Sequence, residues 1–291
     1  MADTRRRTGT PISPLFRAVL GLEVFFGVAS LATIGFFPED TATKFAWEIK
    51  SLAMAAVLGG LYFAFAPTLI LQFLARRWEM IRVIIPAAFA FTTAELVATI
   101  LHWDLFFIGT LRFNIWLASY VLPPPLLLAM YLYQERRSSH PPGGLPLPRA
   151  LRALFLGLGA LLTLDALIGF ISPAYLISSF PWTLTPLTAR VLSGWVLVLG
   201  ALLLSIAREN DRDRVRLASP VLILLLPAIA IQVMRFREQV DLGHPRLWAN
   251  AVLLAALAAC GVFLAQGSWK ESLGWGSGPE GDPGIDSASN L

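Results

Sequence analysis

The chain has 291 residues, of which 56% are hydrophobic and only 14% are charged, and its mean hydropathy is +0.65. Soluble globular domains carry about 25% charged residues, so this composition excludes an ordinary soluble protein. Apolar stretches of the length that crosses a bilayer as a helix recur along the chain, and the short alternating segments of a transmembrane β-barrel are missing. We therefore predict an all-α integral membrane protein.

Eight transmembrane helices are predicted in chain order. They cover approximately residues 15–37, 51–74, 80–103, 113–133, 151–171, 184–206, 216–236 and 246–265. The first stretch is too long for the apolar region of a signal peptide and contains Glu23, so we expect it to remain in the mature protein. Two four-helix units are predicted over 14–133 and 151–266, joined by a linker over 134–150 and flanked by disordered tails over 1–13 and 267–291.

The distribution of basic residues predicts the orientation. Of the 23 Lys and Arg residues, sixteen fall on the side of the N-terminus and six on the opposite side, while Arg190 lies inside a predicted span. Because cytoplasmic loops are enriched in Lys and Arg, both termini are expected in the cytoplasm, which also favours an even number of spans. The expected partner is the lipid bilayer of a bacterial cell membrane, and the basic balance does not indicate nucleic acid.

The two halves of the chain resemble each other. FAWEIKSLAMAAVLGG (45–60) aligns without a gap with FPWTLTPLTARVLSGW (180–195), and RVIIPA (82–87) aligns with RLASPV (216–221). The spacing stays near 132 to 135 residues. A duplicated unit of four helices has an even number of spans, so both copies would have the same orientation and form a parallel repeat.

Ionisable side chains inside predicted spans are costly and are therefore candidates for a functional site. Asp165 and Arg190 lie at similar predicted depths in neighbouring antiparallel helices, so they are expected to form an ion pair. Two interpretations remain open: a clamp between the fifth and sixth spans, or a site where Arg190 receives an anionic substrate group.

Glu95 is the third candidate, at a similar depth in the third span. If it faces the same cavity, two acids share one base, and the additional carboxylate would favour its protonated form, as proton coupling requires. The alternative is a neutral Glu95 that hydrogen-bonds Thr92, Thr93 or a neighbouring helix. Glu23 is expected in the inner leaflet and is not predicted to be catalytic.

Three consecutive prolines, Pro123, Pro124 and Pro125, fall within the fourth span and predict a kinked or broken helix. Such a break can expose carbonyl groups to a binding cavity, or it can be a structural kink.

No catalytic, metal-binding or cofactor-binding motif is visible, and Cys260 is the only cysteine. The sequence therefore predicts no cofactor and gives no reason to expect an enzyme; an enzyme acting on a lipid is the least favoured hypothesis. The favoured hypothesis is a transporter or permease-like protein with a polar site in the outer half, between the repeats. The alternative is a non-catalytic scaffold or accessory subunit in which the charges only fix helix packing. A small-molecule or ion substrate belongs to the first hypothesis alone.

Overall fold

The computed structural model describes residues 9–138, 143–269 and 273. Within these ranges the regular secondary structure is helical, apart from two isolated β-bridges. The long helices are α2 (Pro14–Ser30), α4 (Leu52–Leu74), α6 (Ile85–Leu101), α7 (Leu111–Val121), α8 (Pro123–Arg137), α9 (Arg149–Ile171), α11 (Pro186–Glu209), α12 (Ser219–Arg235) and α13 (Pro245–Ala265). A π-helical segment, Leu31–Gly35, continues α2. The connections contain the short helices α3 (Thr41–Lys44), α5 (Trp78–Ile81) and α10 (Pro173–Ser179), and 3₁₀ turns at Pro38–Asp40, Trp103–Leu105, Arg216–Ala218 and Arg237–Gln239.

Seven helical stretches of the described chain are long and apolar enough to cross a membrane. They are Pro14–Gly35, Leu52–Leu74, Leu111–Arg137, Arg149–Ile171, Pro186–Glu209, Arg216–Arg235 and Pro245–Ala265. This agrees with the predicted all-α, multi-pass membrane protein in a lipid bilayer. The stretch predicted over 80–103 differs, because α5 and a loop precede α6, which has only 17 residues. Eight spans are therefore not confirmed.

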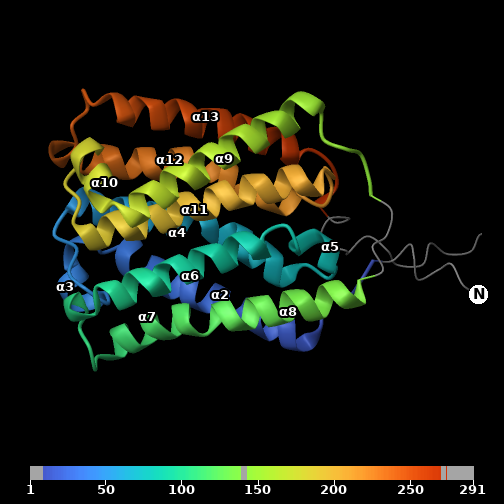
Figure 1. Ribbon diagram of the computed structural model, residues 1–291, viewed down its shortest axis with the longest axis horizontal. Coiled ribbons are helices and arrows are strands. Elements are labelled where there is room, and N and C mark those ends of the chain that lie inside the picture. Colours follow the sequence, from blue (N-terminus) through green and yellow to red (C-terminus); the bar gives the residue numbers. More distant parts are fainter. Residues whose placement is uncertain (1–8, 139–142, 270–272, 274–291) are drawn as a thin grey trace, which may run out of the picture.

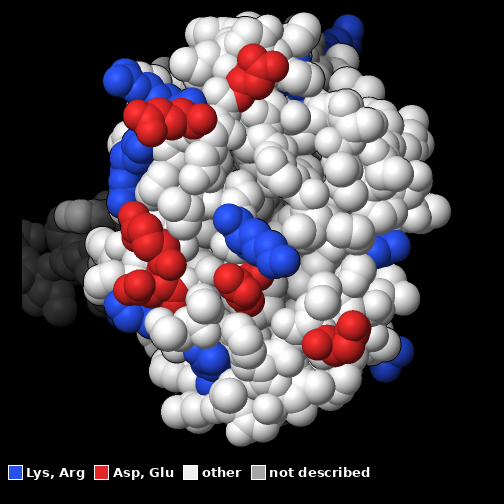
Figure 2. Space-filling view, turned by 90° about the vertical axis from the view of Figure 1, so that its left-hand side faces the viewer, with Lys and Arg blue, Asp and Glu red and all other residues white. Residues whose placement is uncertain are grey.

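The long helices run roughly along one axis, with α4 and α11 in the centre of the bundle (Figure 1). Helix α12 packs on α4, α6 and α9 pack on α11, and α13 packs on α12. The end of the bundle that carries α3 and α10 is called the α10 end below, and the opposite end is called the α5 end. Seen from the α10 end, acidic and basic side chains are interspersed on a largely uncharged surface (Figure 2). Large apolar side chains are exposed along the sides of the helices, among them Leu161, Ile171 and Val252, as contact with lipid requires.

The sequence sets the helix starts locally. Ser51 and Thr185 accept hydrogen bonds from the first turns of α4 and α11, and proline occupies the first turn of many of the other helices. The three consecutive prolines follow this rule: α7 ends at Val121, and Pro123–Pro125 form the first turn of α8. Proline is tolerated there because the amide groups of a first turn have no partner within the helix.

Small residues allow α9 and α11 to approach closely. A Cβ atom on Gly159 would lie 3.0 Å from the carbonyl oxygen of Gly200, and one on Gly200 would lie 2.6 Å from Thr163 Oγ1. Close backbone approach of this kind is the usual basis of helix association in membranes, where lipid offers no hydrophobic driving force. The crossing therefore fixes α9 against α11 next to the residues discussed below.

Both described chain ends pack at the α5 end. Within the tail predicted over 1–13, the amide of Thr10 donates to Glu79, and the Ile12 amide donates to the Arg76 carbonyl. The Arg76 amide in turn donates to the carbonyl of Leu273. Parts of the predicted tails lie outside the described residues, namely 1–8, 270–272 and 274–291. The same holds for residues 139–142 of the predicted linker.

A network of ion pairs joins the helices at the same end. Arg82 contacts Glu135 of α8 at 3.2 Å and Glu209 of α11 at 2.7 Å, and Glu209 also contacts Arg214 at 3.1 Å. The Glu209 side chain is only 6% exposed. These pairs connect the two halves of the chain through buried charge.

Candidate functional site

Asp165 belongs to an ion pair that bridges three helices at the α10 end. Its carboxylate accepts hydrogen bonds from Arg246 Nη2 of α13 at 3.0 and 3.1 Å and from the Tyr175 hydroxyl of α10 at 2.9 Å. Arg246 also donates through Nη1 to Ser179 Oγ at 2.8 Å. Both charged side chains are partly shielded, with exposed fractions of 26% for Asp165 and 19% for Arg246. Asp165 is thus neutralised by an arginine of the last span.

Arg190 does not pair with Asp165, so the predicted ion pair is wrong. Arg190 Nη1 lies 2.6 Å from His102 Nε2, and its Nε donates to the carbonyl of Phe170 at 3.1 Å. The reason is depth: α11 begins at Pro186, which leaves Arg190 within the first two turns, whereas Asp165 lies nearly two turns before the end of α9. The guanidinium therefore reaches the open carbonyls that end α9 instead of the acid below them.

His102 is the base that meets Arg190, at the point where α6 has ended. Burial and the positive charge of Arg190 lower the pKa of His102, and nearby Asp104 only partly opposes this. A neutral imidazole can accept the hydrogen bond from Arg190 through an unprotonated Nε2. Arg190 thereby connects α6, α9 and α11.

Glu95 is fully buried between α6 and α11, away from both arginines. Neither carboxyl oxygen has a hydrogen-bond partner among the described residues, because Thr92 and Thr93 donate to carbonyls of their own helix. The carboxyl group occupies the space where a side chain on Gly194 would stand. An ionised carboxylate in this position would be strongly unfavourable. The three predicted site residues consequently lie in three separate environments.

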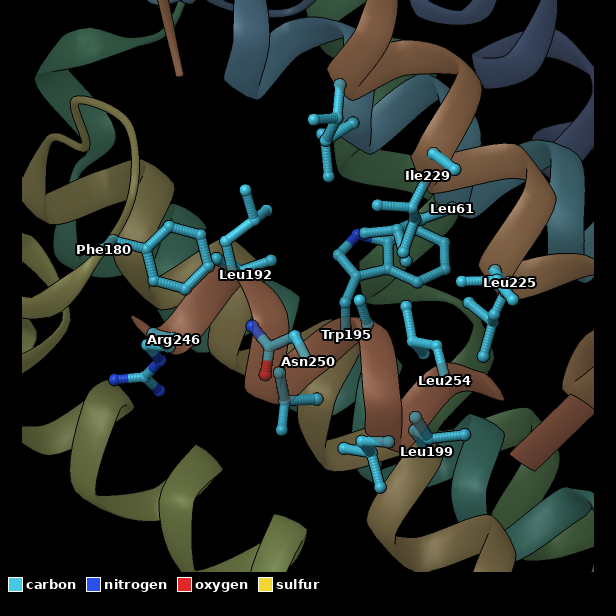
Figure 3. A pocket seen from close by; sticks show the side chains of 18 of the residues that line it. Leu61, Phe180, Leu192, Trp195, Leu199, Leu225, Ile229, Arg246, Asn250 and Leu254 are labelled. Atoms are coloured by element: carbon cyan, nitrogen blue, oxygen red, sulfur yellow. The ribbon is translucent and has the colours of Figure 1, made fainter. Parts of the chain in front are cut away.

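An apolar cavity of about 330 Å³ lies beside the Asp165–Arg246 pair (Figure 3). Its walls come from α4, α9, α10, α11, α12 and α13, with Leu61, Leu192, Trp195, Leu225 and Leu254 among the lining residues. Helix α9 packs on α11 and α13 packs on α12, with little direct packing of α9 against α13. The cavity therefore occupies the space between two helix pairs, and its volume is in the range of small-molecule sites.

Polar groups are concentrated in one part of this lining. Asp165, Arg246 and Asn250 supply them, and Figure 3 shows Arg246 and Asn250 on the same side as Phe180. Trp182 also lines the cavity, and its indole Nε1 is buried without a hydrogen-bond partner among the described residues. The cavity thus combines a long apolar wall with an ion pair and an amide, a combination suited to an amphiphilic molecule.

Several of these residues were not predicted. The sequence places Arg246 among the basic residues on the side opposite the N-terminus and Trp182 in the repeated motif at the outer interface, and it singles out neither Tyr175 nor Asn250. Their positions near the starts of α10 and α13 could have placed them at the α10 end, but their convergence depends on how α13 packs. Conversely, Pro123, Pro124 and Pro125 line neither this cavity nor a smaller one between α2, α4, α6, α7 and α11.

The described residues contain no group of three or more His, Cys, Asp or Glu side chains that could hold a metal ion. Comparison with protein-family models, with curated proteins and with solved structures found no match to this chain. The fold and the cavity define a class: an α-helical multi-pass membrane protein with an apolar cavity among its helices.

Proposed function

We propose that this protein is permease-like and takes an amphiphilic, lipid-like molecule from the membrane into the cavity between α9, α11, α12 and α13. The observation that carries the proposal is the apolar cavity with Asp165, Arg246 and Asn250 gathered in its lining. An apolar chain would replace contacts with lipid, and the polar groups would orient the head of the molecule.

The polar part of the lining favours a neutral or zwitterionic head group. Asp165 already compensates the charge of Arg246, so an anion would have to displace that carboxylate. Within this proposal, the polar site consists of Asp165 and its neighbours. The other two residues predicted from the sequence, Glu95 and Arg190, are not part of it.

We further propose eight membrane spans: the seven long stretches given above and, in addition, the shorter helix α6. Support comes from the two described chain ends, which both bond to Arg76 at the α5 end: the Ile12 amide donates to its carbonyl, and its amide donates to the Leu273 carbonyl. An even number of crossings requires both ends on one side. The predicted cytoplasmic side is then the α5 end, where the arginine-rich network lies. Both termini would face the cytoplasm of a bacterial cell.

A parallel duplication is supported by reciprocal packing. In the alignment, α4 corresponds to α11 and α6 to α12, and α4 packs on α12 as α11 packs on α6. The motif that precedes each central helix also adopts the same contact: the rings of Phe45 and Trp47 lie 4.7 Å apart, and those of Phe180 and Trp182 lie 4.6 Å apart. A two-fold axis along the membrane normal would produce both relations.

The proposal is tested with the purified full chain in lipid nanodiscs and a fluorescent lysophosphatidylcholine as the probe. Ala251→Trp fills the cavity from α13 and is expected to weaken probe binding at least about tenfold. Val252→Trp is the matched control, since Val252 is 70% exposed on the outer surface of the same helix, and it should bind like the wild type. Equal binding by the wild type and Ala251→Trp would overturn the proposal.

Transport is measured separately, as movement of the same probe between the leaflets of proteoliposomes. If the protein is a permease, the wild type and Val252→Trp should move the probe between the leaflets, and Ala251→Trp should not. The scaffold alternative is supported by the inter-helix contacts of Arg190 and Asp165, which join α6, α9, α11 and α13. It predicts neither binding nor movement of the probe in any of the three proteins.

A further inference from the structure

A second and smaller cavity, of about 70 Å³, lies between α2, α4, α6, α7 and α11. The surface of this cavity is mostly apolar, but eight of its lining residues have polar side chains: Glu23, Ser30, Tyr62, Thr68, Gln72, Thr92, Ser119 and Tyr120. None of its described lining residues carries a positive charge. Its volume admits a few water molecules and excludes the amphiphile proposed for the larger cavity.

Two of the lining side chains have buried polar atoms without partners. Glu23 Oε1 and Gln72 Nε2 make no hydrogen bond among the described residues, and Gln72 is only 2% exposed. Buried polar groups are nearly always satisfied, since leaving one unpaired costs about 1–3 kcal/mol. An acceptor and a donor without partners among the described residues therefore lie in the wall of one small cavity, which favours a small hydrogen-bonding occupant.

Two carboxyl groups lie near a pair of tyrosines in the cavity wall: the half-buried Glu23, which lines the cavity, and the buried Glu95, which does not. The hydroxyls of Tyr62 and Tyr120 lie 3.0 Å apart, and both tyrosines are buried. Tyr120 is within electrostatic range of Glu23 from α2 and of Glu95 from α6, and Tyr62 is within range of Glu95. The titratable groups that line the cavity together with Glu23 are thus the two tyrosines, of which Tyr120 is within electrostatic range of Glu23.

We propose that this cavity is a proton-binding site in which Glu23 takes up a proton from cavity water. The proton leaves a hydronium ion, an O–H bond forms at the Glu23 carboxylate, and release returns the proton to water. Because the lining supplies no positive charge, uptake removes an otherwise uncompensated anion from the low-polarity interior. The hydroxyl pair of Tyr62 and Tyr120 lies where a hydrogen-bonded path to Glu95 would run. This site goes beyond the proposed function, since proton binding here requires no amphiphile.

The test is infrared difference spectroscopy of the full chain in nanodiscs, between near-neutral and alkaline buffers, where exposed carboxyl groups are already ionised. The wild type is expected to lose a protonated-carboxyl C=O band on alkalisation, and Glu23→Gln should lack that change. Tyr120→Phe keeps the ring and should retain the band with a shifted titration midpoint. The matched control is Glu39→Gln, because Glu39 is exposed, and its difference spectrum should equal that of the wild type.

Two results would overturn the proposal. One is a Glu23→Gln protein, with helical circular dichroism like that of the wild type, that retains the entire wild-type difference spectrum. The other is loss of the wild-type band at constant pH when choline chloride is replaced by sodium chloride, which would assign the cavity to an alkali-metal ion.

Discussion

The ion pair between Asp165 and Arg246 is expected to hold α13 against α9 with a coupling free energy of about 1–2 kcal/mol. Two opposite charges about 4 Å apart attract by about 4 kcal/mol at an effective dielectric constant near 20. The exposed fractions of 26% and 19% reduce this value, since fully exposed pairs contribute only about 0.2–1 kcal/mol. Because the contacts are short, at 3.0 and 3.1 Å, we expect the coupling free energy to exceed that of fully exposed pairs.

A double-mutant cycle measures this coupling. The free energy of unfolding is determined in mixed micelles for the wild type, Asp165→Asn, Arg246→Gln and the double variant, and the departure from additivity is the pair energy. The exposed pair of Asp40 and Lys44, 48% and 42% exposed, is the control and should show coupling near zero. Additivity within about 0.3 kcal/mol at the Asp165–Arg246 pair would refute the assignment of this contact as a clamp between α9 and α13.

Three further predictions concern packing and charge elsewhere in the bundle. Gly194→Ala inserts a methyl group where the Glu95 carboxyl stands and should lower the unfolding free energy by about 1–3 kcal/mol, whereas Gly157→Ala, which meets open space, should not destabilise the protein. Arg82→Gln removes the ion pairs to α8 and α11 and should cost about 2 kcal/mol in the same assay; no loss would show that the network is dispensable. Because the pKa of His102 is lowered in the fold, the unfolded chain binds more protons, so stability should fall as the pH drops below the unfolded value of about 6.5, and His102→Gln should remove that dependence.

The helical membrane class could be predicted from the sequence because it depends on local properties. Apolar runs of bilayer length and proline or serine at helix starts are visible in the residues themselves, and α9 ends at Ile171, as the apolar pattern predicts. The break at Pro123 follows equally from the chemistry of proline.

The site could not be predicted in the same way, because it depends on which helices meet. Counting residues placed Asp165 and Arg190 at one depth, but Arg190 lies about two residues nearer the helix end than Asp165, and its side chain reaches the end of α9. The true partner of Asp165 lies 81 residues away on α13, and nothing in the local sequence of Arg246 distinguishes it from a loop arginine. The apolar sequence around Glu95 marks this residue as unusual. Its buried position without hydrogen-bond partners depends on Gly194 of α11, which leaves space for the carboxyl group.

Trp195 separates the two cavities and makes coupling between them testable. Of the described residues, only Trp195 and Phe65 line both. On the side of the smaller cavity the indole contacts Tyr62 and Phe91, at ring-centroid distances of 4.8 and 4.6 Å, and it also contacts Phe65, which lines both cavities, at 5.2 Å. A molecule that fills the larger cavity therefore restricts the same ring that packs on the tyrosine pair, and a two-site linkage must be reciprocal.

We accordingly expect the affinity for the lysophosphatidylcholine probe to change between near-neutral and alkaline pH in the wild type. Glu23→Gln should bind the probe with an affinity that no longer depends on pH in this range, because the titrating group is gone. Trp195→Leu should still bind the probe, but its affinity should depend less on pH, since a leucine side chain does not contact both the probe and Tyr62 as the indole does. If Glu23→Gln keeps the wild-type pH dependence of probe binding, the two cavities act independently, and Trp195 is only a wall between them.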